Sequence, residues 1–105
     1  MNTQAALTEA VYYILLSLAS PRHGYGIMQE TERMSQGRVK LAAGTLYGAL
    51  NGLLDRGWIQ AVPGAEDSRR KEYALTERGR EALEGELDRL KELVENGENV
   101  LGGEA

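Results

Sequence analysis

The chain has 105 residues, of which 42% are hydrophobic, so it is long enough for one domain with a single modest core. It contains no cysteine and one histidine, which excludes disulfides, thiolate metal sites and multi-histidine zinc sites, and no cofactor is expected. No apolar run approaches the length of a membrane span, and the N-terminus lacks the pattern of a signal peptide. These features predict a cytoplasmic protein.

The net charge of −4 is unevenly distributed along the chain. Between Arg33 and Lys71, seven Lys and Arg residues stand against three Asp and Glu, which is a local net charge of +4. From Glu77 onward, four cations stand against nine carboxylates, which is a net charge of −5. This asymmetry is expected if one surface approaches nucleic acid and another is held away from it. Ordinary solvated faces are the alternative explanation.

Three short amphipathic helices are predicted first, because apolar residues recur at the i, i+3, i+4 spacing of a helix. The three apolar stripes run from Leu7 to Ala19, from Ile27 to Met34 and from Leu46 to Leu54. A Ser-Pro pair at 20–21 ends the first helix. Turns are expected at 22–24, between the first two helices, and at 35–37, and Gly57 ends the third helix.

A β-hairpin and one long helix are predicted next. Residues 58–62 and 69–75 are interpreted as strands that flank a turn rich in Pro, Gly, Asp and Ser. Thr76 is a good N-cap for a final helix that continues to about Glu98 and would be roughly 33 Å long. Residues 99–105 are expected to be frayed or disordered.

This order of elements predicts a mainly α protein with a small β-hairpin, which is an α+β fold of the winged helix-turn-helix type with an added C-terminal dimerisation helix. In a winged helix-turn-helix, the third helix enters the major groove of DNA. We therefore expect residues 1–76 to form a DNA-binding domain, residues 77–98 a dimerisation helix and residues 99–105 a tail.

The face of the third helix opposite its leucines is small and polar. It presents Gly44, Gly48 and Asn51, with Thr45 beside them. Glycine allows close approach to bases and phosphates, a Thr hydroxyl can hydrogen-bond to either, and the Asn amide matches the donor and acceptor pair of adenine. We expect this face to contact DNA. The alternative is that its glycines permit tight packing against a neighbouring element.

Tyr47 and four cations extend the predicted DNA-contacting set. Tyr47 lies between the two faces of the third helix, so it either offers its hydroxyl to a phosphate or belongs to the core. Arg69, Arg70 and Lys71 follow the predicted wing tip, where cations would straddle phosphates, with a solvated turn balanced by nearby carboxylates as the alternative. Lys40, just before the third helix, completes the set.

Two other residues have a structural and a functional interpretation. His23, near the start of the second helix, is more often a turn-forming or partly buried residue than a phosphate contact. Trp58 follows the stop at Gly57 and is expected to anchor the first strand in the core.

The last predicted helix carries a seam of apolar residues. Leu83, Leu87, Leu90 and Val94 step by four, three and four, which is the spacing of a coiled coil. The stripe could instead pack on the first helix of the same chain. A partner helix is favoured because so long a helix would overhang a domain of this size. Two copies would then hold two reading helices about 34 Å apart, as a palindromic site requires.

Four stretches of the sequence resemble motifs of the PadR family of bacterial transcriptional repressors, in their usual order. They are PRHGYGI at 21–27, GTLY at 44–47, LLDRGWI at 53–59 and RRKEYALTERG at 69–79. The resemblance extends over nearly all of residues 7–94. It implies a winged helix fold, a dimer joined through the last helix and the first helix, and repression by blocking promoters. Leu7 and Val11 of the first helix thereby join the predicted dimer contacts.

The chain looks like the short class of this family, which has a single C-terminal helix. Family members often respond to small hydrophobic or aromatic molecules, and the resemblance therefore implies such an effector. The prediction is a sequence-specific double-stranded DNA-binding repressor that acts as a homodimer on a palindromic operator. The alternative is a winged-helix adaptor that docks a protein partner. An enzyme is not expected, because no nucleophile, base or metal cage can be assembled from these residues.

Overall fold

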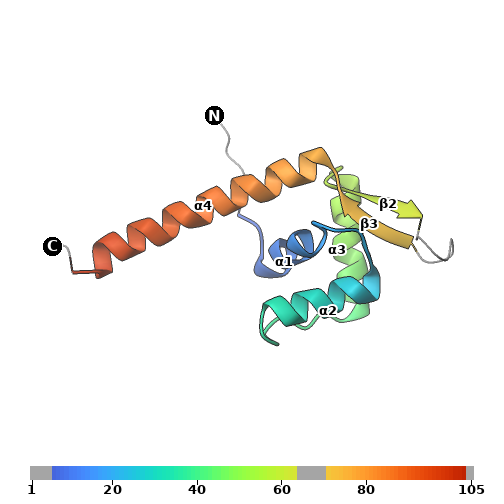
Figure 1. Ribbon diagram of the computed structural model, residues 1–105, viewed down its shortest axis with the longest axis horizontal. Coiled ribbons are helices and arrows are strands. Elements are labelled where there is room, and N and C mark those ends of the chain that lie inside the picture. The colour runs from blue at the N-terminus through green and yellow to red at the C-terminus, as the bar shows by residue number, and fades with distance from the viewer. Residues whose placement is uncertain (1–5, 64–70, 104–105) are drawn as a thin grey trace.

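The computed structural model describes residues 6–63 and 71–103, and within them it has four helices and three strands (Figure 1). The elements are α1 (Glu9–Ser17), β1 (Arg22–His23), α2 (Gly24–Met34), α3 (Ala43–Asp55), β2 (Ile59–Pro63), β3 (Lys71–Leu75) and α4 (Glu77–Leu101). Three short helices, a hairpin and a long helix follow one another as predicted, so the α+β class is confirmed.

The three strands form one antiparallel sheet in the order β1-β3-β2. β2 and β3 make the predicted hairpin, in which Ala61 lies opposite Tyr73. β1 lies on the other side of β3, with Arg22 opposite Tyr73. The sequence predicted only a turn at 22–24, because two residues are too few to show a period. The hairpin tip, residues 64–70, is outside the described residues.

The core lies where the apolar faces of the first three helices meet the sheet. It is formed by Ile14, Leu15, Leu18, Ile27, Leu46, Leu50, Leu53, Ile59 and Tyr73. Trp58 is partly buried against this cluster, as predicted for a core anchor. The guanidinium carbon of Arg56 lies 5.0 Å from the centroid of the Trp58 ring, which adds a cation–π contact at the end of α3.

Caps and a left-handed glycine set the ends of the helices next to the sheet. Gly57 has φ +74°, and the N–H groups of Gly57 and Trp58 donate to the carbonyls of Leu54 and Leu53 at 3.0 and 3.1 Å. This Schellman arrangement ends α3 at the predicted glycine. Thr76 caps α4 as predicted, because its hydroxyl oxygen accepts the N–H of the residue three positions later at 3.1 Å.

α4 is the longest element, with 25 residues and a length of about 37 Å. Its first half lies beside α1, and its second half extends beyond the rest of the molecule, whose longest dimension is 59 Å (Figure 1). The helix ends at Leu101, so residues 99–101 are helical and not frayed as expected. Among the described residues, no helix is both long and apolar enough to cross a membrane.

Candidate nucleic-acid interface

α3 presents its small, polar face to solvent. The leucines on its other face, at positions 46, 50 and 53, are at most 3% exposed. Gly44, Thr45, Gly48 and Asn51 are all exposed, as the spacing of the leucines predicted. The buried leucines fix how α3 is rotated, and the opposite side is therefore available to an external partner.

The three glycines of α3 have open space in front of them. A Cβ atom added at Gly44, Gly48 or Gly52 would meet no atom of the described chain within 4 Å. Tight packing of these glycines against another element is therefore not seen in the part of the chain that the structure describes. Each glycine costs about 1 kcal/mol of helix propensity relative to alanine, and close approach to a partner is a use that offsets this cost.

Tyr47 lies at the edge of this face. Its side chain is 45% exposed, so it is not purely a core residue. Its hydroxyl lies over Gly24 at the start of α2, where an added Cβ would be only 2.2 Å from the hydroxyl oxygen. Burial, and then repulsion from Tyr47, raise the pKa of the Tyr73 hydroxyl. Tyr47 thus joins α3 to α2 and β3 while part of it stays accessible.

The predicted cations differ in how they are placed. Lys40 precedes α3 and Lys71 begins β3; both are exposed, and neither forms an ion pair within the described residues. Arg69 and Arg70 lie outside the described residues, so their positions are not tested. Arg38, by contrast, pairs with a carboxylate at the start of α1 and is engaged within the chain.

His23 and Arg22 hold the turn between α1 and α2. The Nδ1 atom of His23 accepts the Gly26 N–H at 3.3 Å and so caps α2. The Nε–H of Arg22 donates to the Ser17 carbonyl at the end of α1 at 2.7 Å. The turn-forming interpretation of His23 is therefore confirmed.

The predicted dimer seam divides into two parts. Three of its residues pack against the core of their own chain, and they are Leu7, Val11 and Leu83. Leu87 and Val94 are 41% and 57% exposed, and Leu90 between them is partly exposed. The apolar surface continues along the helix to Val100 and Leu101. Packing within the chain thus accounts for the near half of α4 and leaves the far half uncovered.

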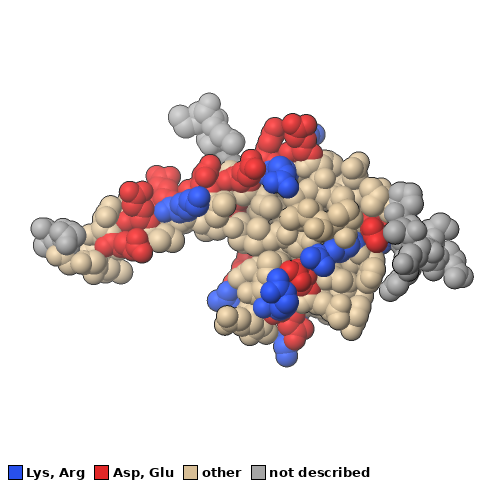
Figure 2. Space-filling model, viewed as in Figure 1, with Lys and Arg blue, Asp and Glu red and all other residues tan. Residues whose placement is uncertain are grey.

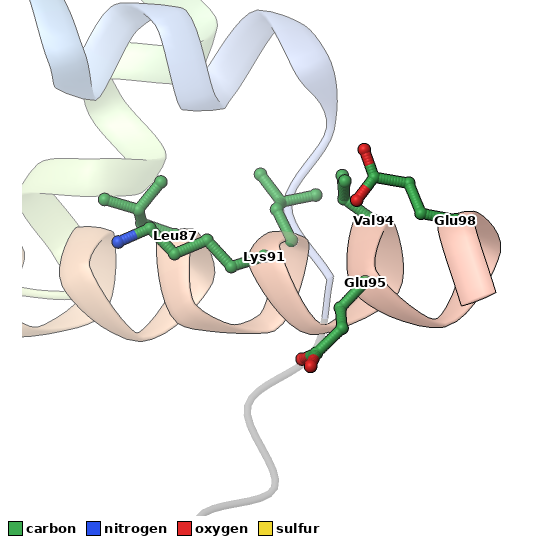
Figure 3. Close-up of a pocket in the computed structure, with 6 residues that line it drawn as sticks. Leu87, Lys91, Val94, Glu95 and Glu98 are labelled. Carbon is green, nitrogen blue, oxygen red and sulfur yellow. The ribbon is translucent and has the colours of Figure 1, made fainter. Parts of the chain in front are cut away.

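A shallow groove of about 300 Å³ follows this far half of α4 (Figure 3). Its lining residues are Leu87, Leu90, Lys91, Val94, Glu95 and Glu98. In Figure 3, Leu87, Val94 and Glu98 point to the same side of the helix. An apolar floor flanked by charged side chains is typical of a helix that packs against a partner helix.

Sequence analysis did not single out Glu86, which is only 1% exposed. Its carboxylate accepts hydrogen bonds from Arg89 at 2.8 and 2.7 Å and from the Leu7 N–H at 3.2 Å. The bonds from Arg89 lower the pKa of the Glu86 carboxyl, although burial opposes them. Its burial could have been inferred from Gly79 and Ala82, because the three residues share one face of α4 and all are buried.

Replacing Glu86 by Gln is expected to lower the free energy of unfolding by about 1–3 kcal/mol at pH 7, the typical contribution of hydrogen bonds to a charged group. Because the folded-state pKa lies below the ordinary value of 4.5, this contribution is present above that pH and is lost as the pH falls through the folded-state pKa. Urea unfolding at pH 7 and pH 3 should show a large difference from the natural chain only at pH 7. The exposed Glu84→Gln is the control, and an undiminished difference at pH 3 would contradict the prediction.

Acidic side chains line the outer edge of α4 in the view of Figure 2. The exposed carboxylates of this helix are Glu77, Glu81, Glu84, Asp88, Glu92, Glu95 and Glu98. Their negative potential repels a polyanion. Nucleic acid is therefore disfavoured along α4, whereas the exposed face of α3 carries no carboxylate before Asp55.

Comparisons with known proteins agree with this architecture. No curated protein matches the sequence significantly. A solved PadR family transcription regulator from Clostridium difficile is 23% identical with a TM-score of 0.71, and the match covers 91% of this chain and all of that one. A transcriptional regulator from Clostridium thermocellum is 22% identical with a TM-score of 0.70, covering 89% and 88% of the two chains.

A third solved structure is that of BpsR from Bordetella bronchiseptica, whose DNA binding is regulated by 6-hydroxynicotinic acid. It is 18% identical with a TM-score of 0.70, and the match covers 86% of this chain and 60% of BpsR. At these identities the three structures establish a shared fold. The model of the PadR-like transcriptional regulator family matches residues 13–85, which is most of the sequence. The chain therefore belongs to the PadR-like family of transcriptional regulators.

Proposed function

We propose that the chain is a repressor that binds a palindromic double-stranded operator in the cytoplasm, with α3 in the major groove. Membership of a family of transcriptional regulators gives the broader class, a DNA-binding regulator and not an enzyme. The observation that carries the finer proposal is the open space in front of the α3 glycines. Thr45 and Asn51 on the same face supply the polar groups that read base edges.

The repressor acts as a homodimer joined by α4, with residues 1–76 as the DNA-binding domain and residues 77–98 as the dimerisation helix. The exposed Leu87 and Val94 support this arrangement, because an apolar seam needs a partner. The far half of α4 is also too short to be a stable helix in isolation, since isolated helices under about 12–15 residues are marginal in water.

A small hydrophobic or aromatic effector is proposed to bind beside this dimer contact. The groove on α4 supports it, because Leu87, Leu90 and Val94 give an apolar floor and Lys91 offers a cation to an acidic substituent. BpsR provides a precedent on the same fold, since its DNA binding is regulated by an aromatic acid.

Leucine in place of Gly48 is expected to lower operator affinity about tenfold or more, because the added side chain fills the space that a groove wall would occupy. The fold should be unharmed or stabilised by roughly 0.5–1 kcal/mol, since leucine is the better helix former. Fluorescence anisotropy with an operator selected from random duplexes measures the affinity, and thermal unfolding measures the stability. Asn96→Leu on α4 is the matched control. Unchanged affinity in Gly48→Leu would refute groove insertion of α3.

A winged-helix adaptor that docks a protein is the competing function, and salt dependence separates the two. Replacing Arg69 and Arg70 together by Ala is expected to weaken DNA binding and to reduce the slope of log K against log salt by about 2, one unit per lost phosphate contact. Arg80→Ala with Lys91→Ala removes equal charge from α4 and should leave the slope unchanged. If both pairs behave alike, or if the natural chain shows no salt-dependent DNA binding, the adaptor is favoured.

A further inference from the structure

Glu86 lies where α4 passes the segment that leads into α1. One of its carboxylate oxygens accepts the Leu7 N–H, which belongs to the residue before the N-cap of α1. Both oxygens also receive the guanidinium of Arg89, one turn along α4. Tyr12 of α1 is close enough that Glu86, after burial, contributes to raising the pKa of the Tyr12 hydroxyl. The carboxylate thus links two helices that are far apart in sequence.

An ion at this position is not needed for packing alone. Burying a carboxylate is costly unless hydrogen bonds satisfy it, and an apolar side chain of similar size is often as stable. The difference is direction. A carboxylate that receives a guanidinium fork and a backbone N–H accepts one relative arrangement of the groups, whereas apolar contacts tolerate several.

The position of this link along α4 gives it leverage. Thr76 and Gly79 hold the start of the helix against β2, and Leu83 packs on the core. Beyond Glu86 the helix continues through 87–101, about 22 Å, with mostly exposed side chains. A swing of about 10° at Glu86 would move the far end by roughly 4 Å, close to the rise of one base pair.

We propose that Glu86 is a positioning residue that fixes the direction of α4 relative to the winged unit and thereby sets the operator spacing that a dimer accepts. The spacing part rests on the proposed function, whereas the direction of α4 within one chain does not. Arg89 is the second member of this link, and Leu7 supplies its backbone donor. The expected consequence of losing the link is a change in geometry, beyond any change in stability.

The geometry is tested in the full chain without DNA. Because the sequence lacks cysteine, Gln29→Cys on α2 and Glu92→Cys on α4 allow a pair of spin labels at exposed sites. Labelled chain is diluted into unlabelled chain, and the distance distribution is measured by double electron–electron resonance. Glu86→Gln is expected to shift or broaden the distribution by about 4 Å or more. Glu84→Gln, an exposed carboxylate on the same helix, is expected to leave it unchanged, and an unchanged distribution in Glu86→Gln overturns the proposal.

Operator spacing is the second readout. Palindromes whose half-sites are moved apart or together by one base pair are compared with the best spacing for the natural chain. In Glu86→Gln the discrimination between them is expected to fall about tenfold, while affinity for a single half-site stays within about twofold. A parallel loss at every spacing would indicate a merely structural role and overturn the proposal. If the natural chain binds no DNA, the proposed function fails while the distance measurement still decides the role of Glu86. If Glu86→Gln does not fold, Arg89→Gln, which keeps the Leu7 bond, replaces it with the same expected outcomes.

Discussion

Alanine at position 79 is expected to lower the free energy of unfolding by about 2–4 kcal/mol, near the upper end of overpacking effects. The added Cβ would lie 1.9 Å from the carbonyl oxygen of Trp58 and 2.8 Å from its carbonyl carbon. This carbonyl is not free to move, because it accepts the Thr76 N–H at 3.0 Å, and the Trp58 N–H is bound to Leu53 at the end of α3. The first turn of α4 would have to separate from the corner between α3 and β2.

Thermal unfolding followed by circular dichroism, at one fixed protomer concentration, measures this effect. The expected fall in Tm for Gly79→Ala is roughly 10–25 °C. Gly52→Ala is the matched control, because it is the same change in a helix where the added Cβ meets only open space. The control is expected to be stabilised by about 0.5–1 kcal/mol. Similar melting of the Gly79→Ala chain and the natural chain would rule out the close approach to Trp58.

Glycines on two helices show which part of a site can be predicted from sequence. The glycines of α3 alternate with leucines at helical spacing, so their exposure follows from the burial of Leu46 and Leu50. Gly79 also lies in a helical run, but its role depends on the Trp58 backbone, which is distant in sequence and reaches it only through the hairpin. Periodicity identifies the face of a helix, whereas contact with a distant carbonyl requires the assembled fold.

The features missed from sequence have a common cause. β1 consists of two residues, and no alternation can be recognised over so short a segment. Glu86 is a charged residue on a buried face, which contradicts the usual relation between charge and exposure. Its burial makes sense only once Arg89 and the Leu7 N–H are placed around it. In both cases the stabilising partner is not visible in the local pattern.

The apolar stripe of α4 was predicted in position but not in its division. A helix that packs on its own domain and a helix that pairs with another chain need the same i, i+3, i+4 spacing. Leu83 therefore looked equivalent to Leu87 in sequence, although it packs on the core of its chain and Leu87 is 41% exposed. Where the winged unit ends relative to α4 decides between them, and that position depends on tertiary packing.

This division makes the dimer testable without unfolding the winged unit. Replacing Leu87 and Leu90 together by Glu is expected to convert a dimer, with twice the 11.5 kDa mass of one chain, into a monomer in light scattering. Two carboxylates in a seam would have to be desolvated opposite their copies, which apolar contacts cannot offset. Operator affinity is expected to fall about 100-fold or more, because the second half-site no longer benefits from a linked copy.

The matched control adds the same two charges on the other side of α4. Asn96→Glu with Asn99→Glu changes residues that are exposed and turned away from the Leu87–Val94 stripe, so mass and affinity should stay unchanged. In the Leu87, Leu90 variant, helical circular dichroism should also fall, since the far half of α4 loses its partner while the core around Leu83 remains packed. An unchanged mass would exclude the seam, and a monomer that keeps full operator affinity would show that α4 pairing does not serve DNA binding.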